Sequence, residues 1–192
     1  EQRFLETGSP KNLTLFYAAA QGNRDGSGAD HFAHEGMLKR VVGGHYNMVP
    51  ELGKLIIANK LEAYNLPQGT LSQLFRDVAA HKLGTLTHVG LNTFADPRIE
   101  GGKLNSVTTE DIVEVVEVLG QERLLYKAIP VDIAFIRGSI ADENGNVTLE
   151  HECCTNEATS IAQAAKNSGG KVIVQVEKVV QAGSVDPKLV KI

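Results

Sequence analysis

The stretch that is most informative about the fold is Glu62-Ala63-Tyr64-Asn65-Leu66-Pro67-Gln68-Gly69-Thr70-Leu71. It predicts a buried strand that passes through a short turn into a helix. Tyr64-Asn65 ends the strand, and Pro67 fixes its own φ before the helix starts. Residues 68–70 place an amide, an unshielded backbone and a hydroxyl where a helix has free N–H groups. The turn is therefore a candidate site for an anionic group at the edge of an α/β sheet, and the alternative is an ordinary strand-to-helix turn.

Composition indicates a globular protein of ordinary hydrophobicity, with 192 residues of which 42% are hydrophobic. The 19 Lys and Arg against 23 Asp and Glu give a net charge of −4, and no basic run favours a nucleic-acid or anionic-membrane partner. The apolar runs are too short for a membrane-spanning helix, and there is no signal-peptide pattern, so we expect a cytoplasmic protein. Because the first residue is Glu1 rather than Met, a targeting segment that has been removed stays an alternative.

Short apolar runs alternate with helical patterns along the chain, which is typical of an α/β domain. The strands are predicted at Leu13–Ala18, Arg40–Val42, Leu61–Tyr64, Thr87–Leu91, Leu124–Lys127, Ile133–Arg137, Val147–Glu150 and Val172–Val176. The helices are predicted at His31–Leu38, Val49–Asn59, Thr70–His81, Thr109–Glu114 and Asn156–Asn167. Continuous apolar strands favour a parallel or mixed sheet that is covered on both faces.

Turn residues add two features to this pattern. Asp142-Glu-Asn-Gly-Asn146 predicts a hairpin, and Asn144-Gly145 suits the positive φ values of its turn. The stretch from Asp96 through the Gly101–Asn105 loop is irregular, and loops of that length are often functional or make subunit contacts. No linker or repeat is visible, so we expect one folding unit.

Two further glycine-rich stretches follow predicted strands. Gln21-Gly22-Asn23 opens a flexible loop after the first strand, and Gly43-Gly44-His45-Tyr46 follows the second. We expect both turns to reach the carboxyl edge of the sheet, beside Gln68 and Gly69. Their spacing matches neither a P-loop nor a dinucleotide-binding fingerprint.

Histidines and cysteines give little indication of a metal or a base. His31, His34 and His45 have no carboxylate at an interpretable spacing, so we expect them on the helix surface or in packing contacts. The adjacent Cys153 and Cys154 predict reduced thiols, and with His151 they form only a weak zinc pattern.

Ordered blocks of sequence resemble the family I coenzyme A transferases, specifically the alpha-type half of the acetate, propionate and 3-oxoacid transferases. The blocks are Ala63–Gln73, Thr93–Arg98 with Gly101–Asn105, Asp132–Arg137, and Asp142–Asn146 with its following strand. Pro97-Arg98 and the Gly101–Asn105 loop look most like the single-chain short-chain acyl transferases, in which alpha-type and beta-type halves are fused. The resemblance implies an α/β fold with an open, mostly parallel sheet flanked by helices and an antiparallel hairpin (NagB/RpiA-like).

The resemblance also implies a reaction, in which an acyl-CoA gives its CoA to another carboxylate through a glutamyl-CoA thioester on the enzyme. The expected partners are acyl-CoA, short-chain carboxylates, the beta-type half and further copies in a homo-oligomer. No cofactor or metal is expected, because coenzyme A is carried by the substrate. On the family pattern Gln21, Gly22, Asn23, Gln68 and Gly69 line the carboxylate pocket and orient substrate, with helix capping as the alternative for Gln68.

The sequence departs from a complete enzyme of this family. The nucleophilic Glu belongs to the beta-type half, and Glu143 is rejected as a substitute because the hairpin turn explains its surroundings. Residues 1–192 also look like an alpha-type domain without its first strand, so we expect a partial chain that is inactive alone and has no catalytic residue. The alternatives are a non-catalytic ligand-binding or assembly domain and, ranked last, a sugar-phosphate isomerase, which would need a basic phosphate site and a general base.

Overall fold

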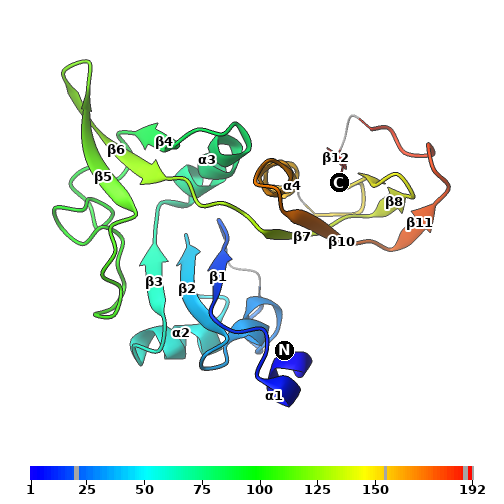
Figure 1. Cartoon of the computed structure of the whole chain (residues 1–192), viewed down its shortest axis with the longest axis horizontal. Coiled ribbons are helices and arrows are strands. Elements are labelled where there is room, and N and C mark those ends of the chain that lie inside the picture. The colour runs from blue at the N-terminus through cyan, green and yellow to red at the C-terminus, as the bar shows by residue number, and fades with distance from the viewer. Residues whose placement is uncertain (20–21, 154, 188–189, 192) are drawn as a thin grey trace. The chain divides into compact units, whose positions relative to one another are not determined.

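The computed structural model of the chain describes residues 1–19, 22–153, 155–187 and 190–191 (Figure 1). The chain divides into two compact units, where the sequence analysis expects one folding unit. The first unit contains Glu1–Leu71 and Leu86–Lys127, and the second contains Ser72–Thr85 and Ala128–Ile192. No helix among the described residues is long and apolar enough to cross a membrane.

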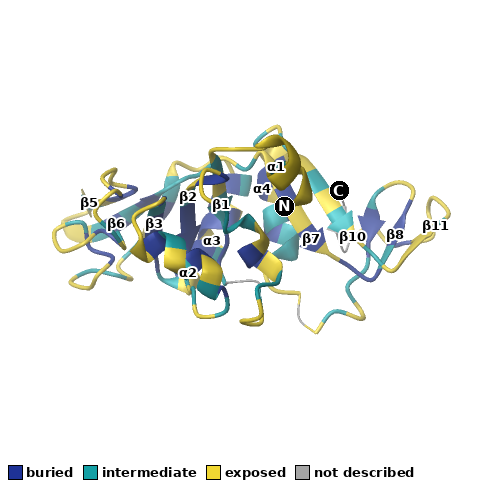
Figure 2. Cartoon of the chain, turned by 90° about the horizontal axis from the view of Figure 1, so that it is seen from below, coloured by how far each residue is buried: buried dark blue, intermediate teal, exposed yellow. Residues whose placement is uncertain are grey.

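A three-stranded parallel sheet organises the first unit, in the order β1-β2-β3. Its elements are α1 (Gln2–Thr7), β1 (Leu13–Phe16), η1 (Gly28–Phe32), β2 (Leu38–Gly43), α2 (Pro50–Ile57) and β3 (Glu62–Asn65). Val41 of β2 pairs with Leu15 on one side and Ala63 on the other. Leu52 and Ile56 of α2 pack into the core beside Val41, and α2 shows one buried and one exposed side (Figure 2).

The predicted helix at His31–Leu38 is wrong. A 3-10 helix covers Gly28–Phe32, and the chain then turns through Gly36, whose φ is 85°, into β2. Residues 35–37 of the expected helix form this turn instead, because a residue at positive φ ends a right-handed helix.

The predicted helix at Thr109–Glu114 is also wrong. β5 (Val113–Val118) begins there and forms an antiparallel hairpin with β6 (Gln121–Lys127). Val113 lies opposite Tyr126, and both side chains are buried. Cross-strand packing of this kind overrides a local helical pattern.

The boundary between the units falls within α3 (Gln68–Ala79) and β4 (Gly84–Thr87). The predicted helix after the Glu62–Leu71 stretch is confirmed, and it begins two residues earlier than expected, at Gln68. The predicted strand at Thr87–Leu91 is wrong beyond Thr87. Leu91 donates from its backbone N–H to the His88 carbonyl (3.2 Å), and Gly90 has a φ of 100°, so the chain turns there.

The second unit combines a parallel strand pair with a mixed sheet of order β11-β8-β9-β12. Its elements are β7 (Ile133–Arg137), β8 (Ile140–Asp142), β9 (Asn146–Val147), α4 (Ala158–Asn167), β10 (Lys171–Gln175), β11 (Lys178–Val180) and β12 (Val190–Lys191). β7 and β10 are parallel, with Phe135 opposite Ile173. The α/β class is thus confirmed, with parallel and antiparallel strand pairs distributed over several sheets, one of which contains both kinds.

The hairpin predicted at Asp142–Asn146 is confirmed by the antiparallel pairing of β8 and β9. Of its two central residues, Gly145 has a positive φ of 80°, while Asn144 does not. The Gly145 N–H donates a hydrogen bond to the Asp142 carbonyl (2.9 Å), which closes a tight turn. Only Gly145, the last residue of that turn, has a left-handed backbone conformation. The Asp142 carboxylate also accepts from the backbone N–H groups of Asn144, Asn146 and Gly183.

Candidate functional site

Three strand ends meet at Gly44, directly after β2. Its N–H donates to the Ala18 carbonyl (3.1 Å), in the loop after β1. A Cβ atom on residue 44 would lie 2.5 Å from that carbonyl oxygen and 2.9 Å from the Cβ of Gln68, the first residue of α3. Only glycine fits this position, so the expected convergence of the three turns on one edge of the sheet is confirmed.

Asn65 joins the second and third strand ends. In the orientation that satisfies its amide, its side-chain nitrogen donates to the carbonyls of Gly43 (3.3 Å) and Gly44 (3.0 Å). Its backbone N–H donates to the Gly102 carbonyl (2.7 Å), which ties the long loop to the same edge. Gly102 has a φ of 73°, and a Cβ there would lie 2.4 Å from the Leu66 side chain. The edge is therefore rigidly held by backbone contacts.

Two tyrosines hydrogen-bond to backbone carbonyls at this edge. Tyr17 donates its hydroxyl to the His45 carbonyl (3.3 Å), and Tyr46 donates to the Tyr64 carbonyl (2.6 Å). Their rings pack edge to face with centroids 5.9 Å apart. Burial raises the pKa of both hydroxyls above the usual range, so each stays a neutral hydrogen-bond donor.

Gln68 and Gly69, two of the predicted site residues, lie at the N-terminus of α3, and both are exposed. The next two N–H groups, of Thr70 and Leu71, both donate to the Pro67 carbonyl, at 2.9 and 3.1 Å. No described residue accepts from the backbone N–H of Gln68 or Gly69, or bonds to the Gln68 side chain. This turn can therefore offer two N–H groups and one amide to a carboxylate.

Gly22 and Asn23 lie in the loop after β1, on the same side of the sheet as Gly44. A Cβ on residue 22 would lie 2.5 Å from the Met48 carbonyl oxygen, so the loop packs against the chain that follows β2. The Asn23 side chain accepts from the Ser27 hydroxyl (2.8 Å). Gln21, the remaining predicted site residue, lies outside the described residues.

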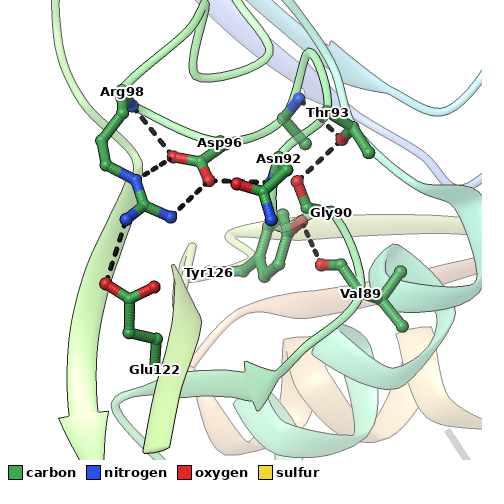
Figure 3. Close-up of polar contacts among 9 residues, drawn as sticks. Val89, Gly90, Asn92, Thr93, Asp96, Arg98, Glu122 and Tyr126 are labelled. Carbon is green, nitrogen blue, oxygen red and sulfur yellow. Dashed lines mark hydrogen bonds and ion pairs between the residues drawn. The ribbon is translucent and has the colours of Figure 1, made fainter.

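The long irregular stretch, residues 88–112, is held by Asp96, whose side chain is 1% exposed (Figure 3). Both carboxylate oxygens of Asp96 accept from the Arg98 guanidinium, at 3.0 and 2.8 Å. The same carboxylate accepts from the backbone N–H groups of Asn92 and Arg98, and Arg98 extends to Glu122 on β6 (3.0 Å). These bonds, led by the guanidinium, lower the pKa of Asp96.

Tyr126 closes the other end of this network. Its hydroxyl donates to the Val89 carbonyl (2.9 Å), and a Cβ on Gly90 would lie 2.3 Å from that hydroxyl oxygen. Burial raises the pKa of Tyr126 to about 12, so the hydroxyl remains a donor at physiological pH. The close fit explains why the chain needs glycine at position 90 (Figure 3).

The other predicted chemical groups lie elsewhere. His31 and His34 both contact the Glu1 carboxylate, at 2.5 and 2.9 Å, a partner that the spacing of the residues in the sequence does not indicate. The contact joins residues 30 positions apart, which spacing alone does not reveal. Within the described residues, no group of three or more His, Cys, Asp or Glu could hold a metal ion. Cys154 lies outside the described residues.

The remaining residues that the sequence analysis considers for a chemical role are His45 and Glu143. His45 is exposed in the loop between β2 and α2, so of the two expected settings it has a surface position rather than a packing contact. Glu143 lies in the β8–β9 turn, where its carboxylate accepts from the Ala182 N–H (3.2 Å) and its own N–H donates to the Val180 carbonyl (3.2 Å). These bonds support the structural interpretation of Glu143.

Comparison with known proteins identifies the class. Residues 2–192 match the family model for coenzyme A transferase. The chain is 47% identical over 98% of its length to caffeate CoA-transferase from Acetobacterium woodii, covering 36% of that protein. It is 43% identical over 99% of its length to the acetate CoA-transferase YdiF from Escherichia coli K12, again covering 36%. The chain belongs to the coenzyme A transferase family.

Solved structures agree with this assignment. The acyl-CoA transferase YdiF from Escherichia coli O157:H7, in a thioester complex with CoA, superposes with a TM-score of 0.95 at 42% identity. That match covers all of this chain and 37% of the other. Glutaconate coenzyme A-transferase from Acidaminococcus fermentans shares the fold, with a TM-score of 0.71 at 17% identity. The chain thus spans about a third of the length of the curated relatives it matches first.

Proposed function

We propose that the chain is the alpha-type part of an acyl-CoA:carboxylate CoA-transferase that moves CoA between short-chain acids such as acetate, propionate or 3-oxoacids. The observation that carries this proposal is the 42% identity and 0.95 TM-score, over the whole chain, to an acyl-CoA transferase whose crystal structure is a thioester complex with CoA. In the proposed reaction a glutamate carboxylate from the beta-type half attacks the acyl-CoA. This attack forms an acyl-glutamyl anhydride and releases the CoA thiolate, which then attacks the glutamyl carbonyl, releases the first carboxylate and leaves a glutamyl-CoA thioester. A second carboxylate reverses these steps, so that its acyl-CoA forms and the glutamate carboxylate is regenerated.

The alpha-type part supplies orientation rather than a bond-forming group. Gln68 and Gly69 present an amide and two N–H groups that no described residue uses. Such donors suit a carboxylate whose oxygen gains charge during acyl transfer. Gly22 and Asn23, with Gln21, complete the proposed carboxylate-binding site from the loop after β1. The rigid packing at Gly44 keeps these turns at fixed separation.

The partners and setting follow from this role. The proposed partners are acyl-CoA, a short-chain carboxylate, the beta-type half of the same enzyme and further copies in a homo-oligomer. We infer a cytoplasmic enzyme that needs no cofactor or metal beyond the CoA of its substrate. A purely non-catalytic binding domain has no observation in its favour.

The test uses the full-length enzyme with a panel of carboxylates and radiolabelled acetyl-CoA. We expect transfer of CoA with initial rates that give parallel lines in double-reciprocal plots, because CoA stays covalently bound to the enzyme between the two half-reactions. The proposal would be contradicted if none of the carboxylates in the panel accepted CoA. It would also be contradicted by intersecting lines, which indicate that both substrates must bind before the reaction begins.

A further inference from the structure

Arg24 lies in the loop after β1 and is attached to the loop after β2. Its Nε donates to the Asn47 carbonyl (3.1 Å), and its backbone N–H donates to the Met48 carbonyl (3.2 Å). The neighbouring Gly22 packs on the same Met48 carbonyl. The position of the Arg24 side chain is therefore tied to the edge of the sheet on which Gly44 and Gln68 meet.

The backbone of Arg24 adopts a conformation that L-residues avoid, with a φ of 72°. Glycine and asparagine take this region easily, whereas a long side chain gains nothing from it. A residue in such a sparsely populated region keeps its conformation only where the surrounding structure holds it there. The two backbone-carbonyl contacts are what hold Arg24 here.

The guanidinium of Arg24 has unused hydrogen-bonding capacity. No described residue accepts from its two terminal nitrogens, which leaves a planar fork of donors. Asp25, the adjacent acid, instead accepts from the Ser27 N–H (3.0 Å). By contrast, Arg40 and Arg98 each bind two carboxylates.

Arg24 is the one positively charged residue in the sequence of the three loops at this edge of the sheet. The loops that follow β1, β2 and β3 are residues 17–27, 44–49 and 66–67, and Arg24 is their one lysine or arginine. The substrates of the proposed reaction are all anions, because they carry carboxylates or the phosphates of CoA. An arginine fork matches either oxyanion with two parallel hydrogen bonds.

We propose that Arg24 is a substrate-binding residue whose terminal guanidinium nitrogens bind an oxyanion of the incoming substrate, a carboxylate or a CoA phosphate. This inference rests on the proposed function and adds a charged contact to the neutral donors at Gln68 and Gly69. Arg24 holds the anion in place, and it takes no part in making or breaking bonds.

The test compares three variants of the full-length enzyme. Arg24→Gly removes the guanidinium and suits the positive φ, so folding is not at risk. Arg24→Gln removes the charge, and Arg24→Lys keeps the charge but loses the fork. The matched control is Arg123→Gln, at a partly buried arginine of β6 whose guanidinium hydrogen-bonds only to neighbours along its own strand among the described residues.

Two arms distinguish the source of the oxyanion. If Arg24 binds the carboxylate, Arg24→Gly and Arg24→Gln raise KM for acetate about tenfold or more, and kcat changes little. If Arg24 binds a phosphate, KM for acetyl-CoA rises instead. Removing the 3′-phosphate from the CoA substrate should then raise KM less in the variant than in the wild type. Arg24→Lys should fall between, and Arg123→Gln should match the wild type.

Calorimetric titration with CoA and with acetate gives a readout without turnover. If Arg24→Gly binds CoA or acetate more weakly than the wild type, the Arg24 contact is supported. If the wild type at the same time transfers no CoA, the proposed function is contradicted although the Arg24 contact stands. An active wild type whose KM values and binding constants change less than twofold in all three variants would overturn the inference. A loss of kcat alone, with both KM values unchanged, would also overturn it.

Discussion

Gly44 lies against Gln68 so closely that a Cβ atom on residue 44 would be 2.9 Å from the Gln68 Cβ and 3.0 Å from its Cα. The same atom would meet the Ala18 carbonyl oxygen at 2.5 Å. One glycine after β2 therefore sets the distance between the loop after β1 and the first turn of α3. The carboxylate-binding site that we propose depends on this distance.

Gly44→Ala should disturb that geometry. The new methyl group meets backbone on one side, so the loops must move apart rather than a side chain rotate. We expect a loss of about 1–3 kcal/mol in the free energy of unfolding and at least a tenfold loss in kcat/KM. Urea unfolding and steady-state kinetics of the full-length protein measure both. Unchanged kinetics would show that the spacing of these loops does not matter to the reaction.

Gly53→Ala is the matched control, because it makes the same change inside α2. A Cβ there meets no atom within 4 Å, and the residue lies in a helix interior. Alanine loses less backbone entropy than glycine on folding, so we expect stabilisation by about 0.5–1 kcal/mol. The melting temperature should rise while the kinetics stay constant. A lower melting temperature would contradict the structure at α2.

Gln68→Ala separates binding from helix capping. The Gln68 side chain is exposed and bonds to no described residue, so stability should change by less than about 0.5 kcal/mol. Loss of a donor to a developing oxyanion should lower kcat/KM by about tenfold or more. Gln163→Ala, at an exposed glutamine of α4, is the control. Lower stability with full activity would instead favour the capping role.

Asp96→Asn should loosen the long loop. The substitution removes a buried charge that binds Arg98 twice, and we expect a cost of about 2–4 kcal/mol at pH 7. Hydrogen exchange across residues 88–105 should rise, while the exposed Glu117→Gln should leave it unchanged. Equal protection in Asp96→Asn and wild type would mean that the Asp96–Arg98 pair does not order the loop.

The effect of Asp96 should depend on pH in a defined direction. Its folded pKa is lowered, chiefly by Arg98, while an unfolded aspartate titrates near about 3.9. Its contribution is thus fully present above about pH 4 and is lost as pH falls further toward the folded pKa. The stability difference between wild type and Asp96→Asn should therefore be constant from pH 5 to 7 and shrink at pH 3. A difference that grows on acidification would have the wrong sign.

The sequence predicted those helices, strands and loops whose positions are indicated by a pattern of adjacent residues. Continuous apolar runs located the parallel strands, and the turn at Asn65–Gln68 located the start of α3. The glycines after β1 and β2 correctly indicated loops at the edge of the sheet. Each of these signals is a property of a few adjacent residues.

Contacts between distant residues account for what the sequence did not predict. β5 is a strand because Val113 pairs with Tyr126, although Thr109–Glu114 has a helical pattern. Arg24 contacts Asn47, and nothing in the local sequence of either residue indicates it. Glu1 reaches His31 and His34 for the same reason. Tertiary pairing decides these features, and a single sequence does not display it.

The position of the covalent intermediate distinguishes an orienting role for this chain from a catalytic one. Full-length enzyme would be incubated with acetyl-CoA, trapped with borohydride and mapped by mass spectrometry after proteolysis. We predict a modified glutamate outside residues 1–192, with residues 1–192 unmodified. A modified glutamate within residues 1–192, such as Glu143, or no modified glutamate at all would contradict the proposal.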